Sequence, residues 1–264
     1  MEKNLKISSV IIAKNEEFNI GRCIESQLDC IDEIIVLVDI TSTDRTFEIA
    51  KSYPKVKVQA VNWMGYSRTK EYGVSIASND WIFWIDADES MTKELSDEFL
   101  YFKESTPRFS AYSIARRAYF LGKWIKHSGW YPARVNRLFN KNRVKFSDND
   151  VHEHLSVDGL TGELKNDLEH FTDPNIQHYF EKFNLYTTLA AEELVKKGKK
   201  NRLSDLLIRP PFIFVKMYFL KLGFLDGIEG FILAVFSAAY VFTKYCKFWE
   251  LKKVINNQNG KKIS

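Results

Sequence analysis

The stretch Trp81-Ile82-Phe83-Trp84-Ile85-Asp86-Ala87-Asp88 is the part of the sequence that decides the fold. Its first five residues are bulky and apolar, which is typical of a strand that is buried on both faces. The two aspartates follow directly, so they are expected at the carboxyl end of that strand. Side chains two residues apart point the same way, so both carboxylates are expected to face one cleft.

The residues before this stretch alternate between strand and helix patterns. Short apolar runs predict strands at 7–13, 33–38 and 56–60, and helical spacing or capping residues predict helices at 19–28, 44–52 and 67–77. Ser42 is the expected cap of the second helix, and Thr92 is the expected cap of a fourth helix that ends near 104. This order predicts an α/β fold with a parallel sheet between helices, in which ligands bind beyond the carboxyl ends of the strands.

The second half of the chain reads differently. Residues 109–171 predict strands and long loops that cover the sheet end, and Asp173-Pro174 predicts the start of a helix that continues to about 197. The polar run at 196–201 is a predicted hinge. We therefore expect an α/β domain over residues 1–200 and a helical, basic and aromatic extension over 201–264.

The charge is unevenly distributed. Residues 196–264 contain 14 Lys and Arg against 4 Asp and Glu, a net charge of +10, whereas the other residues carry −6 of the total of +4. Such a tail fits an anionic membrane surface, and its apolar content argues against nucleic acid as the partner. Its longest uncharged run, 230–243, has 14 residues and falls short of the roughly 20 that cross a bilayer as a helix. A pair of helices lying on the membrane is expected, with a packed helical hairpin or an oligomer interface as the alternative.

Two common phosphate-binding motifs are absent. The turn after the first strand reads Ala13-Lys14-Asn15-Glu16-Glu17 and has no glycine, so it is neither a dinucleotide-binding fingerprint nor a P-loop. A bound diphosphate would need neutralisation by a cation. Asp86 and Asp88 offer oxygen ligands that suit Mg²⁺ or Mn²⁺, although an isolated D-x-D is also common in solvated acidic loops.

The cysteines and histidines favour no structural metal site. Cys23, Cys30 and Cys246 are odd in number and form no C-x-x-C pattern, which fits a reducing compartment. The His152-Glu153-His154 triplet invites a zinc interpretation, but it lacks H-E-x-x-H spacing. We expect His154, or alternatively His170, to be an additional ligand of a metal ion bound with the substrate.

Several segments together resemble one known family. SSVIIAKNEEFNIGRCIES, DEIIVLVDITSTDRTFEIA and NDWIFWIDADE look like the inverting family-2 glycosyltransferases of GT-A fold. YFLGKWIKHSGWYPARVNRLF, VHEHL and KMYFLKLGFLDGIEGFILAVFSAAYVFTKY resemble the bacterial members that add a hexose to the lipopolysaccharide inner core, so the resemblance covers nearly the whole chain. It implies a UDP-sugar donor, a lipid-linked saccharide acceptor and a cytoplasmic location, peripheral on the inner face of the bacterial inner membrane.

The resemblance also implies roles for particular residues. Those expected to hold the nucleotide sugar are Ala13, Asn15, Glu16, Asp39, Arg68, Lys70 and Asp86. Within this set Asp39 would contact the base, Arg68 and Lys70 would lie near the diphosphate, and Asp86 would lie near the ribose and the metal ion, with Asp88 as the principal metal ligand. A turn cap is the alternative for Asp39, and a solvated helix face is the alternative for the two basic residues. The family's small residues after this aspartate are replaced here by Ile40 and Thr41, which alters the expected base pocket.

A general base is still required, because inverting transfer to a hydroxyl needs a group that takes the proton. Glu153 is the predicted base, since it lies in the strand-like run 151–157 with its own face free of the neighbouring histidines; Asp150 is the next candidate. The sequence thus predicts transfer of a hexose, glucose first, from UDP to a hydroxyl of a lipid-linked saccharide. The alternatives are a membrane-associated saccharide-binding scaffold and a sugar-nucleotide-forming nucleotidyltransferase.

Overall fold

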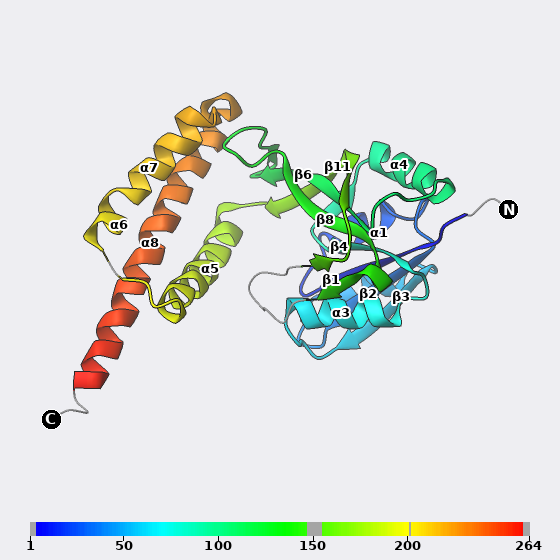
Figure 1. The fold of residues 1–264 in the computed structure, drawn as a ribbon, viewed down its shortest axis with the longest axis horizontal. Helices are drawn as coiled ribbons and strands as arrows, with labels where there is room; N and C mark the ends of the chain where they lie inside the picture. Colours follow the sequence, from blue (N-terminus) through cyan, green and yellow to red (C-terminus); the bar gives the residue numbers. More distant parts are fainter. Residues whose placement is uncertain (1–3, 147–154, 201, 261–264) are drawn as a thin grey trace. The chain divides into compact units, whose positions relative to one another are not determined.

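Four strands of the sheet, β1 to β4, form from the apolar runs identified above. The computed structural model describes residues 4–146, 155–200 and 202–260 (Figure 1). Its strands are β1 (Ile7–Ala13), β2 (Glu33–Asp39), β3 (Val56–Val61), β4 (Trp81–Asp86), β5 (Glu89–Met91), β6 (Ala111–Phe120), β7 (Lys123–Trp124), β8 (Ala133–Asn140), β9 (Val144–Phe146), β10 (Leu155–Val157) and β11 (Thr161–Asp173). The helices are α1 (Ile20–Glu25), α2 (Thr46–Lys51), α3 (Tyr66–Ile76), α4 (Lys93–Glu104), η1 (Lys141–Arg143), α5 (Ile176–Lys196), α6 (Leu203–Leu207), α7 (Arg209–Val215), η2 (Lys216–Leu220), η3 (Gly223–Asp226) and α8 (Gly227–Gly260).

The strand order confirms the predicted parallel sheet and extends it. The described strands follow the order β3-β2-β1-β4-β8-β6-β11-β5, and β1 pairs in parallel with both β2 and β4. From β8 onward the pairing with β4 and β6 is antiparallel. The carboxyl ends of the parallel strands therefore meet at one edge, where β2 ends at Asp39 and β4 ends at Asp86.

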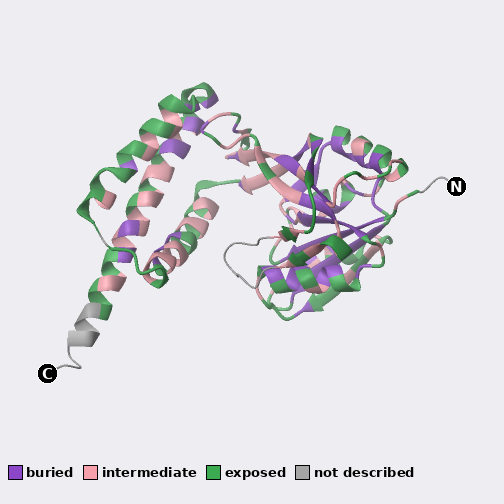
Figure 2. Ribbon diagram, in the orientation of Figure 1, coloured by how far each residue is buried: buried purple, intermediate pink, exposed green. Residues whose placement is uncertain are grey.

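Alternating side chains give the sheet two apolar faces. Phe83 and Ile85 of β4 pack with α1, α2 and α4, whereas Ile82 and Trp84 face α3 and the β9–β10 pair. Figure 2 shows buried residues concentrated in the central strands β1, β2 and β4. Because both faces are covered at the centre of the sheet, β2 and β4 are continuously apolar and carry polar groups only at their ends.

The chain forms two compact units. The first contains residues 1–117 and 133–170, and the second contains 118–132 and 171–264. This division differs from the expected boundary at 200, because α5 packs along α8 and so belongs with the C-terminal helices. In the second unit, Phe120, Ile125 and Leu233 form one apolar cluster, and Ala191, Tyr245 and Phe248 form another.

Two predicted caps differ in the structure. Ser42 does not cap α2; the side chain of Asp44 instead accepts a hydrogen bond from the Thr46 amide at 3.0 Å. Helix α5 begins two residues later than expected, where the Asn175 side chain accepts from the His178 amide at 2.8 Å. Thr92 is confirmed as the cap of α4, since its hydroxyl accepts from the Leu95 amide.

Helix α8 is longer than the uncharged run suggested. The stretch Gly223–Ile255, which joins η3 to most of α8, is long and apolar enough to cross a membrane by length and composition alone, and 22% of its most apolar window is buried within the protein. The expectation that this part of the tail is too short to span a bilayer therefore does not hold for the helix as a whole. A helix packed on protein meets the same criteria, so this feature does not by itself define a membrane span.

Candidate active site at the carboxyl ends of the parallel strands

Asp39 is a buried carboxylate at the end of β2. Its Oδ1 accepts hydrogen bonds from the amide and the hydroxyl of Thr41, both at 2.9 Å, and Lys14 Nζ lies 3.0 Å from its Oδ2. Burial raises the pKa of Asp39, but the bonds from Thr41 and the charge of Lys14 outweigh burial and lower it. Asp39 therefore presents a fixed negative charge.

The loop after β1 is fastened to the loop after β2. Asn15 Oδ1 accepts from the Thr43 amide at 2.9 Å, and the Glu16 amide donates to Thr46 Oγ1 at 2.7 Å. Asn15 has a φ of 55°, a left-handed conformation that asparagine tolerates better than most residues. Side-chain bonds thus shape this turn without the glycine that a phosphate-binding loop would need.

Asp86 lies between two buried cations. Its Oδ1 is 2.8 Å from Nζ of Lys70 on α3, and its Oδ2 is 2.5 Å from Nη2 of Arg137 on β8. Burial would raise the pKa of Asp86, but the charges of Arg137 and Lys70 hold it well below its usual range. Lys70 Nζ also lies 5.0 Å from the centre of the Trp84 ring.

Glu89 extends this charge cluster beneath Asp86. The Glu89 side chain is fully buried; its Oε1 lies 2.6 Å from Arg137 Nη2 and 3.5 Å from Arg116 Nη1. Its Oε2 accepts a hydrogen bond from the Asp86 amide at 3.1 Å. Buried charges are stable only when they are paired and hydrogen-bonded, and these contacts supply that pairing.

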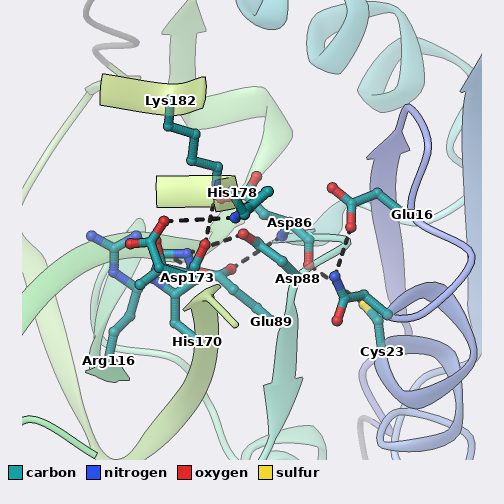
Figure 3. Close-up of polar contacts among 12 residues, drawn as sticks. Glu16, Cys23, Asp86, Asp88, Glu89, Arg116, His170, Asp173, His178 and Lys182 are labelled. Atoms are coloured by element: carbon teal, nitrogen blue, oxygen red, sulfur yellow. Dashed lines mark hydrogen bonds and ion pairs between the residues drawn. The ribbon is translucent and has the colours of Figure 1, made fainter. Parts of the chain in front are cut away.

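Asp88 faces His170. Figure 3 shows the two side chains meeting, with Asp88 Oδ2 3.4 Å from His170 Nε2. Strand β11 brings His170 here by pairing with β5, so that His170 lies opposite Glu89 in the register. Burial would lower the pKa of His170, but the neighbouring Asp88 and Glu89 raise it.

Among the described residues, two candidate ligands for a hard or borderline cation lie close together. Asp88 and His170 bring a carboxylate oxygen and an imidazole nitrogen together, which suits Mn²⁺ and related ions. Both oxygens of Asp86 already face cations, so Asp86 is poorly disposed to be a second carboxylate ligand. Among the residues that the structure describes, no three His, Cys, Asp or Glu form a metal-binding group, so the remaining ligands would have to come from the substrate, from water or from outside this part of the chain.

The other predicted site residues divide into three groups. Ala13 ends β1 in the core, at the base of the site. Arg68 lies exposed on α3, whereas Lys70 two residues later is buried against Asp86. Glu153 and His154 lie outside the described residues.

Sequence reasoning missed three residues of the charge cluster: Glu89, Arg116 and Arg137. The latter two come from β6 and β8, far from the D-x-D stretch in sequence, and no motif spacing marks them. Glu89 directly follows Asp88, and the acidic run itself was the available signal.

The fold and the site define a class. A parallel-rich sheet with flanking helices, an aspartate at the end of β2 and an acidic cluster after β4 form an α/β arrangement of the GT-A type. Residues 8–157 match the sequence profile described as "Glycosyl transferase family 2". The chain belongs to this family and is a glycosyltransferase, which favours transfer over the scaffold and nucleotidyltransferase alternatives.

Curated relatives match along nearly the full chain. The lipopolysaccharide core biosynthesis glycosyltransferase LpsC of Rhizobium meliloti is 31% identical, with 95% of this chain and 94% of LpsC covered. An uncharacterized glycosyltransferase of Rickettsia typhi is 33% identical, with coverages of 93% and 87%. Among solved structures, S. aureus TarS 1-349 in complex with UDP-GlcNAc overlaps over 96% of this chain and 92% of that chain, at 15% identity and a TM-score of 0.46.

Proposed function

We propose that this glycosyltransferase transfers a hexose, with glucose as the first choice, from a UDP-sugar to a hydroxyl of a lipid-linked saccharide such as the lipopolysaccharide inner core. The observation that carries the proposal is the meeting of Asp88 and His170 beside the buried Asp86 cluster, at the edge where β2 presents Asp39. The name of LpsC supports the acceptor class, since it is described as a lipopolysaccharide core biosynthesis enzyme.

The residues divide the work as follows. Asp39, buried and ionised, is suited to accept the imide N–H of uracil. Lys70 and Arg137 hold Asp86 in place and set positive charge around the site. A Mg²⁺ or Mn²⁺ ion held by Asp88 and the diphosphate would stabilise the charge of the departing UDP. His154, an expected further ligand, lies outside the described residues, and His170 fills that role in the proposal.

Inversion requires the acceptor oxygen to attack C1 from the face opposite the diphosphate. We assign to Glu153 the removal of the proton from the acceptor hydroxyl. This residue lies outside the described residues, between β9 and β10 in the sequence. A carboxylate there would act as the general base during attack.

One experiment tests both assignments. UDP release from UDP-glucose, with deacylated lipopolysaccharide as acceptor, is measured across Mn²⁺ concentrations for Asp88→Asn, Glu153→Gln and the surface control Asp97→Asn. We expect Asp88→Asn to lose turnover and metal response, and Glu153→Gln to lose about a hundredfold or more in kcat with donor affinity kept. Asp97 is exposed and pairs with Lys93 on α4, so its variant serves as the matched control. Normal turnover in Asp88→Asn would refute the metal assignment.

The C-terminal helices are proposed to attach the enzyme to the cytoplasmic face of the bacterial inner membrane. Phe212, Phe219 and Phe224 are each about half exposed, and Lys216 and Lys221 are exposed near them. Figure 2 shows how much of α6 and α7 is exposed. Exposed aromatic residues beside lysines suit the boundary of an anionic lipid surface.

A further inference from the structure

The second unit contains a cavity that the proposed chemistry does not use. It has a volume of about 290 Å³ and lies among the end of β11, α5 and α8. This is near the lower end of the roughly 300–1,000 Å³ range of small-molecule sites, so it suits one small ring rather than a long chain.

A buried carboxylate in the cavity wall has an unsatisfied oxygen. Asp173 is 5% exposed; its Oδ2 accepts a hydrogen bond from the Thr172 hydroxyl at 3.3 Å, whereas its Oδ1 has no hydrogen-bond partner. His178 Nδ1 lies 3.6 Å from Oδ1, beyond hydrogen-bond distance, and is itself without a hydrogen bond (Figure 3). A buried acceptor without a donor is costly, so this oxygen is suited to receive a donor from a ligand.

The rest of the wall is largely aromatic. Trp130, Tyr179, Tyr186 and Tyr240 line the cavity, with Lys182 and Ser237 among its polar members. Burial, and then the charge of Asp173, raise the pKa of Tyr179, so its hydroxyl stays protonated. Ring faces carry negative charge density and attract the slightly positive C–H face of a sugar ring, while sugar hydroxyls supply donors for a carboxylate.

We propose that this cavity binds one sugar ring of the acceptor saccharide, with Asp173 accepting a hydrogen bond from a ring hydroxyl. The inference rests on the proposed function and adds an acceptor-binding site to it. An acyl chain would fill the aromatic space but give Asp173 Oδ1 no hydrogen-bond donor, so a hydroxyl-rich ring fits better. Asp173 is also the last residue of β11, three residues after His170, so one strand contributes to both sites.

Two variants and one control test the site. Asp173→Asn keeps the shape and removes the charge, and Ser237→Leu fills the cavity from α8. Ala239→Leu adds the same bulk at an exposed position on α8 that does not line the cavity. Binding is followed by saturation-transfer NMR, with core oligosaccharide released from lipopolysaccharide by mild acid as the sugar probe and dihexanoyl phosphatidylglycerol as the lipid probe. Kinetics give the ratio of acceptor KM to donor KM.

We expect both site variants to weaken oligosaccharide signals and to raise the KM ratio about tenfold or more, as loss of a charged hydrogen bond does, with Ala239→Leu like wild type. Unchanged ratios in both variants, or displacement of the oligosaccharide by the lipid probe, would overturn the proposal. If wild type binds the oligosaccharide but transfers no hexose, the proposed function fails; variant-sensitive binding would then show a sugar site without an acceptor role. Thermal melts separate these outcomes from misfolding, and Asp173→Asn decides if Ser237→Leu does not fold.

Discussion

At the scale of single residues, the site depends on pairing charges that would otherwise destabilise the protein. Arg137 contacts both Asp86 and Glu89 with one nitrogen, and all three come from strands or strand ends of the first unit. A buried carboxylate tolerates the loss of such a partner poorly, because neither water nor another cation can replace it without rearrangement.

Replacing Arg137 by Met is therefore expected to lower the free energy of unfolding by about 3–5 kcal/mol. Urea unfolding followed by tryptophan fluorescence measures this, since Trp81 and Trp84 lie in the adjacent strand. The matched control is Arg143→Met, because Arg143 pairs at 3.5 Å with a largely exposed Asp158, a contact worth about 0–1 kcal/mol. Equal losses of unfolding free energy in the two variants would show that the buried cluster stabilises the protein no more than the surface ion pair does.

Arg137 also shows the limit of sequence reasoning. The strand at 7–13 was predicted correctly, because a strand buried on both faces appears in the sequence as a continuous run of apolar residues. Lys70 was predicted as a site residue from the family resemblance. Arg137 lies on β8, which meets β4 in antiparallel pairing, and such a contact depends on the tertiary fold rather than on local pattern. Asp173 was predicted only to start a helix, since the burial of its side chain cannot be seen in one sequence.

At the scale of elements, Glu33 ties the amino ends of neighbouring strands together. Its carboxylate accepts from the Ser8 hydroxyl of β1 at 2.5 Å, from the Ser78 amide before β4 at 2.8 Å and from Lys57 of β3 at 2.6 Å. Burial raises the pKa of Glu33, but these donors outweigh it and lower the pKa to about 2. The strand ends opposite the active site are thus joined by one ionised group.

This pKa predicts an acid-dependent contribution to stability. The ionised form is favoured in the folded chain, so the contribution is complete above the ordinary glutamate pKa of about 4.3 and is lost as the pH falls toward 2. Glu33→Gln should lower stability by about 1–3 kcal/mol at pH 7, with the difference from wild type vanishing near pH 2. Denaturant unfolding across pH measures it, with exposed Glu71→Gln as the control. A difference that did not change with pH would contradict the assignment.

At the scale of the whole molecule, the uneven charge divides the chain into a part proposed for catalysis and a part proposed for membrane attachment. The acidic part of the chain carries the proposed catalytic groups, and among the described residues slightly more than half of the exposed large apolar side chains lie in the basic C-terminal part. Peripheral attachment and a membrane-crossing α8 make different predictions for the full chain.

We expect the full chain to float with vesicles that contain phosphatidylglycerol and to bind phosphatidylcholine vesicles weakly. Lys216→Ala with Lys221→Ala should weaken binding by about 2 kcal/mol, roughly thirtyfold, since each surface lysine contributes about 1 kcal/mol. Lys6→Ala with Lys51→Ala, also exposed lysines, is the matched control. Equal flotation with both lipids would remove the electrostatic part, and resistance to alkaline carbonate extraction from bacterial membranes would indicate that α8 crosses the bilayer.

The position of Asp86 between Lys70 and Arg137 has a consequence for the pace of the catalytic cycle. Two carboxylates left to repel each other would move apart whenever the site emptied, and each new donor would have to draw them back. Here one of them is neutralised by the protein itself, so the charge pattern persists between turnovers. The charges that would meet the proposed nucleotide-sugar donor are therefore preorganised, so the reorganisation that solvent would otherwise undergo at each encounter was completed when the chain folded.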